Sequence, residues 1–237
     1  MYVQGYWEAD DGGGGIFTYS ANNTKPADGG MIIAPANKRG RWLRVVSEDE
    51  PLNIRWYGAR SGVDECQGVY LKAAIDYFFK QKKTGTVLIP EGLFSIGTSL
   101  GFYEGVSLIC EGIDVSVIKN ISSGYRYNSF FNHTSHYSPE RYLRMSMSDL
   151  TIDVNMYNLG TWIGAIWVED YFRELTIERV RFTNSGGNII RLMKSSVIAD
   201  SIWDNMDGRA LSTGWENKPD LRFRDNVIRH NMFIRTA

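Results

Sequence analysis

Short strand-like runs recur along the second half of the chain, and this recurrence restricts the possible folds more than any other feature. The similar runs are residues 150–155, 175–184, 197–202 and 221–228. If Ile152, Ile177, Ala199 and Phe223 are taken as equivalent, the steps between them are 25, 22 and 24 residues. Such a period, made of short strands and Asn or Gly turns, is typical of a β-solenoid. Leucine-rich repeats have a similar period, but their fixed leucine pattern is missing.

Asparagine ends each of the four similar runs, at Asn155, Asn184, Asn205 and Asn231. Asn tolerates the left-handed backbone conformation that a tight bend needs, so these positions are consistent with stacked turns. Their spacings of 29, 21 and 26 residues are too irregular to predict a strict ladder.

One segment has the pattern of a helix. Between residues 67 and 82, apolar residues fall at Val69, Leu71, Ala74, Ile75, Phe78 and Phe79. This spacing predicts an amphipathic helix with one buried stripe. The strand-like run 85–89 follows it directly.

Residues 1–50 read as a turn-rich β segment. Glycine turns at 12–15 and 29–30 lead into the strand-like runs 16–19 and 31–34, and residues 41–46 alternate as a half-buried strand does. The glycine run is not a phosphate loop, because no Gly-Lys-Ser/Thr follows and the next element is a strand.

Composition excludes several function classes. The 237 residues have a net charge of -1, so the basic surface typical of nucleic-acid binding is absent. Two cysteines and three scattered histidines do not build a zinc site, and we predict no metal and no cofactor. No signal peptide is visible, and the most apolar stretch, 154–168, is too short to span a bilayer. We therefore expect a soluble protein without membrane insertion.

Part of the sequence resembles a known superfamily. The similar segments are Tyr57-Gly58-Ala59, Gly62-Val63-Asp64, Ala73-Ala74-Ile75, residues 85–92 and residues 105–109 before Glu111-Gly112. They resemble the pectate-lyase-like right-handed parallel β-helix proteins, in the form found in bacteriophage tailspikes and some bacterial polysaccharide enzymes. The resemblance implies an all-β solenoid with one N-terminal capping helix. The chain departs from the usual Asp-Gly-x-Thr-Asp-Asp-Thr pattern, with Ser61-Gly62-Val63-Asp64-Glu65-Cys66 instead.

The first region adds a second likeness. Its two Asp-Gly-Gly turns and the strand Arg41-Trp42-Leu43-Arg44 resemble the segment that precedes the β-helix in phage tailspikes. We divide the chain into residues 1–50, a linker or virion-proximal β segment, and residues 51–237, the parallel β-helix. Nothing in the second part resembles a C-terminal cap, so we expect a partner to cover the last coil or the solenoid to continue in a longer protein.

Carboxylates are the candidates for catalysis, because glycoside hydrolysis needs a pair of them. The candidates are Asp204, Asp207, Asp200 and Glu169. A turn-forming role is the simpler explanation of the run Asp204-Asn205-Met206-Asp207-Gly208. A lyase would need a basic residue instead, for which Lys194, Arg191 and Arg209 are available.

Aromatic residues are dense across the same coils. They are Trp162, Trp167, Tyr171, Phe172, Trp203 and Trp215. Sugar rings stack on aromatic faces, so we take Trp167, Trp203, Trp215 and the basic Arg209 as candidate substrate-binding residues. Core packing or a subunit interface explains the aromatic residues equally well.

These observations favour a phage tailspike or tail-fibre protein that binds host cell-surface polysaccharide. Depolymerisation of that polysaccharide stays an open alternative. The resemblance implies a homotrimer that contacts other tail proteins, located in the virion tail and assembled in the host cytoplasm. Two alternatives share the fold: a bacterial polysaccharide hydrolase or lyase, and a non-catalytic structural or adaptor component of the tail.

Overall fold

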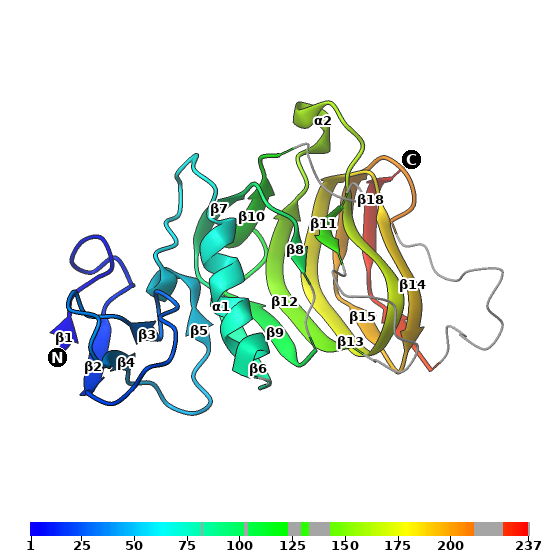
Figure 1. Cartoon of the computed structure of the whole chain (residues 1–237). Coiled ribbons are helices and arrows are strands. Elements are labelled where there is room, and N and C mark those ends of the chain that lie inside the picture. The colour runs from blue at the N-terminus through cyan, green and yellow to red at the C-terminus, as the bar shows by residue number, and fades with distance from the viewer. Residues whose placement is uncertain (82, 102–103, 123–128, 133–142, 211–224, 237) are drawn as a thin grey trace.

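The chain begins with a small antiparallel sheet, which a parallel β-helix follows (Figure 1). The computed structural model describes residues 1–81, 83–101, 104–122, 129–132, 143–210 and 225–236. The N-terminal strands are β1 (Tyr2–Val3), β2 (Gly15–Ser20), β3 (Ile32–Ile33) and β4 (Arg41–Arg44), in the order β1-β2-β4-β3. The runs expected after the glycine turns are therefore strands. The guanidinium of Arg44 lies between the rings of Phe17 and Trp56 and joins this sheet to the solenoid.

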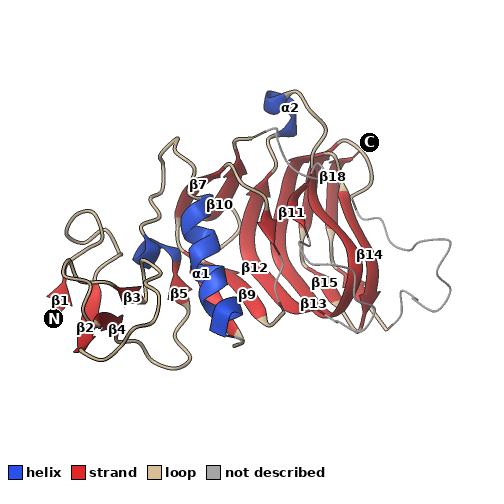
Figure 2. Ribbon diagram, in the orientation of Figure 1, coloured by secondary structure: helices blue, strands red, loops and turns tan. Residues whose placement is uncertain are grey.

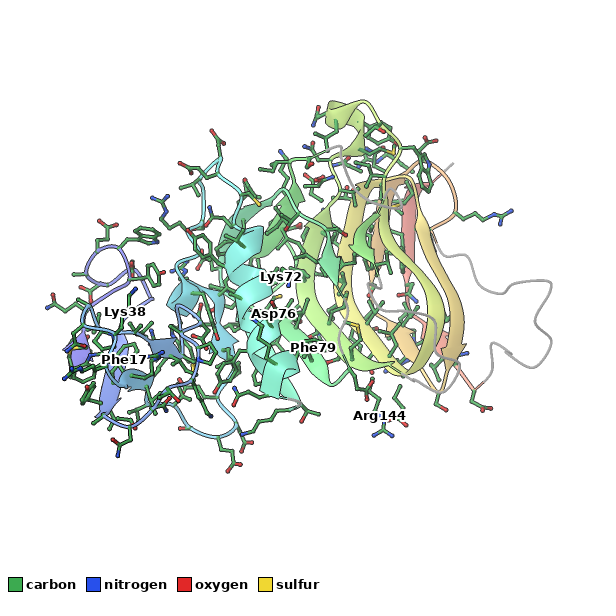
Figure 3. The ribbon with its side chains drawn as sticks, in the orientation of Figure 1. Phe17, Lys38, Lys72, Asp76, Phe79 and Arg144 are labelled. Atoms are coloured by element: carbon green, nitrogen blue, oxygen red, sulfur yellow. The ribbon has the colours of Figure 1, made fainter. Side chains whose placement is uncertain are left out.

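Two helical segments lie at the start of the solenoid (Figure 2). They are the 3-10 turn η1 (Ile54–Tyr57) and the helix α1 (Gly68–Gln81), and the second confirms the predicted helix. The stripe that packs into the core is Leu71, Ala74, Ile75 and Phe78. Val69 and Phe79 were expected in that stripe but are about half exposed, because the i, i+3, i+4, i+7 positions alone form its buried face. Lys72 and Asp76 pair on the exposed side (Figure 3).

Successive coils of the solenoid stack their strands in parallel on three faces, which we number in chain order. The first face contains β5 (Leu52–Asn53), β6 (Gly85–Ile89), β9 (Val106–Cys110), the start of β12 (Leu143–Asp153), the middle of β13 (Gly164–Ser185), β15 (Val197–Ala199) and β17 (Val227–Arg229). The second face contains β7 (Gly92–Ile96), β10 (Ser116–Asn120), the ends of β12 and β13, β16 (Ile202–Met206) and β18 (Met232–Thr236). The third contains β8 (Leu100–Gly101), β11 (Ser129–Asn132), the start of β13 and β14 (Asn188–Lys194). The short helix α2 (Met156–Leu159) lies between β12 and β13.

The register of the coils differs from the predicted repeat. Ile152 pairs with Phe182, whereas Ile177 pairs with Met147 and Ile198. The similar runs at 150–155 and 175–184 therefore lie partly on different faces, and the true steps alternate between 30 and 21 residues. Phe223, the fourth residue of the predicted alignment, lies outside the described residues.

Left-handed residues mark the bends between faces. Asn155, Asn184 and Asn205 have positive φ, as expected, but at the fourth predicted position it is His230 rather than Asn231 that adopts it. Asn205 donates to Asn184 over 2.7 Å, and Asn184 donates to Asp153 over 2.9 Å. Asn231 instead accepts from the backbone N–H of Ser201 in the preceding coil. These amides satisfy backbone and side-chain groups where the strands stop.

The core is a set of apolar rows that run along the solenoid. On the first face the inward row is Val87, Leu108, Met147, Ile177 and Ile198, and on the second it is Phe94, Ile118, Ile152, Phe182 and Trp203. Trp203 stacks on Phe182 with ring centroids 4.5 Å apart and on Phe233 at 6.2 Å. Side chains of the intervening positions point outward, as the period of two in a strand requires.

Candidate functional site

A cavity of about 310 Å³ lies beside the first face, where each coil bends from the third face into the first. Its lining comes from several coils: Thr84, Glu104, Gly105, Ser107, Arg144, Met145, Ser146, Glu174 and Thr176. We call this cavity the groove. Most of its lining side chains bear hydroxyl or charged groups, so it is a polar surface built on a rigid sheet.

A row of hydroxyl groups forms the floor of the groove. Ser107, Ser146 and Thr176 line the groove, and Thr86, which pairs with Ser107, continues their row on the neighbouring strand. Neighbouring strands lie about 4.8 Å apart, so the row presents a regular series of donors and acceptors along the solenoid axis. Side chains alternate between the two sides of a strand, so each outward hydroxyl is next to a core residue. Val87, Met147 and Ile177 directly follow Thr86, Ser146 and Thr176.

Charged side chains form the rim. The carboxylate of Glu104 accepts a hydrogen bond from the backbone N–H of Arg144 over 2.7 Å, and the guanidinium of Arg144 pairs with Glu174 over 3.3 Å. Both side chains of that pair are about half exposed, and Arg144 points away from the strands (Figure 3). Exposed pairs of this kind contribute little to stability, so a ligand can compete for their hydrogen bonds. The rim can therefore donate and accept hydrogen bonds with a polyhydroxylated molecule.

A glycine brings the coils close together at the rim. Gly105 has a φ of 74°, and a Cβ there would lie 2.5 Å from the Thr84 side chain. Its N–H donates to the carbonyl of Arg144 over 2.8 Å, which aligns the backbone that bears the ionic rim. Any side chain at this position would separate the coils.

The three described carboxylates among those predicted from sequence lie in different environments. Asp204 is only 8 % exposed and accepts hydrogen bonds from the Arg235 guanidinium, the shortest of 2.8 Å. Asp200 lies at the preceding bend and faces His230 over 3.3 Å. Asp207 is exposed beyond the end of β16, and Glu169 lies on β13 with a side chain outside the described part.

The predicted substrate-binding residues are also distributed over different environments. Trp203 is 1 % exposed and stacked in the core, so its ring is not available to a sugar. Trp167 lies on β13 with its side chain outside the described part, and Trp215 lies outside the described residues altogether. Arg209 is exposed, as a ligand-binding residue must be.

The groove residues were missed by the sequence reading. Glu104, Arg144 and Glu174 are 40 and 30 positions apart, and no local motif joins them. The step from Arg144 to Glu174 equals the 30-residue coil step between Met147 and Ile177. Only the correct coil register would have predicted that these three residues lie close together.

A second ion pair lies at the bend between the first and second faces. Arg179 donates two hydrogen bonds to Asp149, of 2.6 and 2.9 Å, and these lower the pKa of the Asp149 carboxyl. Both residues have positive φ and belong to neighbouring coils, so this pair fastens one bend to the next.

Within the described ranges, no His, Cys, Asp and Glu side chains gather in a way that could hold a metal ion. Cys66 and Cys110 are free thiols, and burial raises the pKa of Cys110. The helices of the described part are all too short or too polar to cross a membrane.

Comparison with known proteins finds similarities to both parts of this architecture. Residues 1–47 match the phage tail protein small four-stranded β-sheet domain, and the N-terminal sheet described above has that strand number. Residues 1–47 are therefore similar to a phage tail domain, and the solenoid has the parallel β-helix fold. The parallel β-helix fold that the sequence resemblance implied is thus confirmed.

Solved structures share the fold of this chain at low sequence identity. Pantoea stewartii WceF, a glycan biofilm modifying enzyme with a bacteriophage tailspike-like fold, is 14 % identical with a TM-score of 0.68, covering 100 % of this chain and 38 % of its own. The tailspike gp49 of Acinetobacter baumannii bacteriophage Fri1, a capsular polysaccharide depolymerase, is 11 % identical with a TM-score of 0.65, covering 98 % and 49 %. The A-module of Azotobacter vinelandii mannuronan C-5 epimerase AlgE4 is 20 % identical with a TM-score of 0.58, covering 76 % and 50 %. The chain thus spans half or less of the length of these structures, and no curated protein matches its sequence.

Proposed function

We propose that this chain is part of a phage tailspike that binds a bacterial cell-surface polysaccharide, with the groove as the binding site. The observation that supports this most is the joining of a phage tail domain at residues 1–47 to a solenoid with a polar groove on its outer face. Hydroxyl, carboxylate and guanidinium groups in one row suit a polysaccharide, whose repeating units carry many hydroxyls. The N-terminal domain favours a tail protein over a free bacterial enzyme of the same fold.

Binding to purified polysaccharides tests this proposal. The probe is a panel of bacterial capsular, exopolysaccharide and O-antigen preparations, immobilised for surface plasmon resonance with the whole chain as analyte. We expect at least one to be retained, and Arg144→Ala or Glu174→Gln to weaken its affinity about tenfold through loss of charge-assisted hydrogen bonds. The matched control is Arg39→Ala, an exposed arginine of the N-terminal sheet. Retention of no polysaccharide, or equal affinities of Arg144→Ala and Arg39→Ala, would contradict the proposal.

Cleavage of the bound polysaccharide is the finer part of the proposal. Hydrolysis needs two carboxyl groups, and the groove contains Glu104 and Glu174. The acid–base role of Asp204, Asp207, Asp200 and Glu169 stays a prediction beside it. Release of reducing ends from the retained polysaccharide should be lost in Glu174→Gln if the groove cleaves, and in Asp207→Asn if the predicted aspartates do.

The assembly is proposed to be a homotrimer within the virion tail, assembled in the host cytoplasm and in contact with other tail proteins. Tyr2, Ile16 and Val45 are exposed on the N-terminal sheet, opposite the buried Phe17 and Arg44 that face the solenoid. This apolar outer face supports a contact with another tail protein. Light scattering should give three times the chain mass of 26.9 kDa, and a monomer would contradict the trimer.

A further inference from the structure

Trp162 lies in the turn before β13, at the bend that leads from the second face to the third. Its indole rests on Gly186 of the next coil: a Cβ at Gly186 would lie 2.4 Å from the ring atom Cε2. The indole Nε1 donates to the carbonyl of Asp207, one coil further, over 3.4 Å. The ring is nevertheless 40 % exposed.

The coil register explains how one side chain reaches so far. Ser185 pairs with Met206, so Gly186 and Asp207 occupy equivalent positions in neighbouring coils. The N–H of Gly186 donates to the carbonyl of Ile163, and the N–H of Asp207 donates to that of Ser185, both over 2.8 Å. Two coil steps of about 4.8 Å separate the first coil from the third, a span that an indole can bridge only because Gly186 has no side chain.

The turns beneath the indole contain three closely packed glycines, at positions 186, 187 and 208. Gly187 and Gly208 both have φ near +125°, and a Cβ at Gly187 would lie 2.6 Å from the Arg209 carbonyl. A Cβ at Gly208 would lie 2.8 Å from the Gly186 carbonyl. The glycines therefore let the bends approach closely, and the indole lies against Gly186 while 40 % of Trp162 stays exposed.

We infer that Trp162 is a stacking platform for a sugar ring of the polysaccharide, with the exposed Asp207 and Arg209 as hydrogen-bonding groups at its edge. A flat aromatic face packs against the C–H face of a pyranose, and the neighbouring charged groups bind its hydroxyls. This contact lies at a different bend from the groove. It rests on the proposed function, because it takes the same class of ligand.

Binding by matched tryptophan variants tests the inference. The probe is the polysaccharide of the panel that the wild-type chain retains most strongly. We expect Trp162→Ala to weaken its Kd about five- to tenfold, and Trp162→Phe to recover part of that loss. Trp7→Ala is the control, because Trp7 is 55 % exposed on the N-terminal part. The change in tryptophan fluorescence on binding should be absent in Trp162→Phe.

Three further variants separate binding from packing. Gly186→Ala keeps the indole but displaces it, and should weaken binding as Trp162→Ala does. Asp207→Asn and Arg209→Ala alter exposed groups, so they report on the site even if Trp162→Ala does not fold. A lower melting temperature with unchanged Kd in all of these variants would overturn the inference and leave the groove as the binding site. Retention of no polysaccharide by the wild-type chain would overturn the proposed function together with it.

Discussion

At the scale of single residues, Asp11 holds the loop between β1 and β2 with one carboxylate. Its two oxygens accept hydrogen bonds from the N–H groups of Tyr6, Trp7, Glu8 and Gly13, over 2.7 to 3.3 Å. Partial burial alone would raise the pKa of Asp11, but these four amides together lower it. The loop positions Trp7, whose indole donates to the Gly58 carbonyl near the start of the solenoid.

Asp11→Asn should therefore make the chain less stable at neutral pH, by about 1 kcal/mol, because a neutral amide accepts these hydrogen bonds less strongly. The folded-state pKa lies below the unfolded value, so the contribution is full above about pH 4 and disappears as the pH falls through the folded pKa. Urea unfolding at pH 7 and near pH 2 should show the difference from wild type shrinking in acid. Glu8→Gln, an exposed neighbour, is the control; a difference that stays constant with pH would refute the role of the charge.

Arg44 is the second residue on which the N-terminal part depends. Its guanidinium is buried and donates to the carbonyls of Gly13, Gly14 and Gly30, over 2.6 to 3.2 Å. Arg44→Met would leave those carbonyls unpaired, and we expect a loss of about 2 to 4 kcal/mol in unfolding free energy. Arg44→Lys should recover little of it, because an ammonium cannot reproduce the planar fork. Denaturant unfolding of both variants beside Arg39→Met measures this, and equal midpoints for Arg44→Met and Arg39→Met would contradict it.

At the scale of elements, the aromatic stack of β13, β16 and β18 determines how well the last described coils hold together. Trp203→Ala removes the ring between Phe182 and Phe233, and should cost about 3 to 5 kcal/mol. Trp203→Phe should cost much less, because it keeps the stack and removes a buried Nε1 that has no hydrogen-bond partner among the described residues. Denaturant unfolding gives both values. A tenfold loss of polysaccharide affinity in a fully folded Trp203→Phe variant would show that Trp203 contributes to binding.

The same elements show what the sequence could predict. Periods of 3.6 and 2 are local, so α1 and the strands of the N-terminal sheet were recognisable from their own residues. The coil register was not, because each coil carries similar apolar runs on two faces, and 150–155 could be aligned with 175–184 as well as with its true partner. Trp203 was misplaced for a related reason: a tryptophan in a strand faces the core or the solvent according to a register of one residue.

At the scale of the whole molecule, the candidate site belongs to the stacking of coils rather than to any segment. Arg144 and Glu174 meet because each stands just before the first face in successive coils, and Trp162 reaches Asp207 across the coil of Gly186. Residue types alone drew attention to the aspartates of 200–207, where acidic residues are dense in sequence. Adjacency in a solenoid follows the coil step, so a search for function must compare positions one coil step apart, which is 21 or 30 residues in the later coils and up to 39 in the earlier ones.

Stacking also implies that damage stays local. Each coil contacts only its neighbours, so the stability of a solenoid is close to a sum of coil and interface contributions. Trp203→Ala should then raise native-state amide hydrogen exchange in β16, β18 and the end of β13, and leave β2 and β4 at wild-type rates. Arg44→Met should instead raise exchange in β2 and β4 and leave β16 and β18 at wild-type rates. The contacts of Arg44 lie in the N-terminal sheet and at Trp56, at the start of the solenoid. If both variants instead raised exchange throughout, the sheet and the solenoid would unfold as one unit, and binding losses in any variant would have to be corrected for the unfolded fraction.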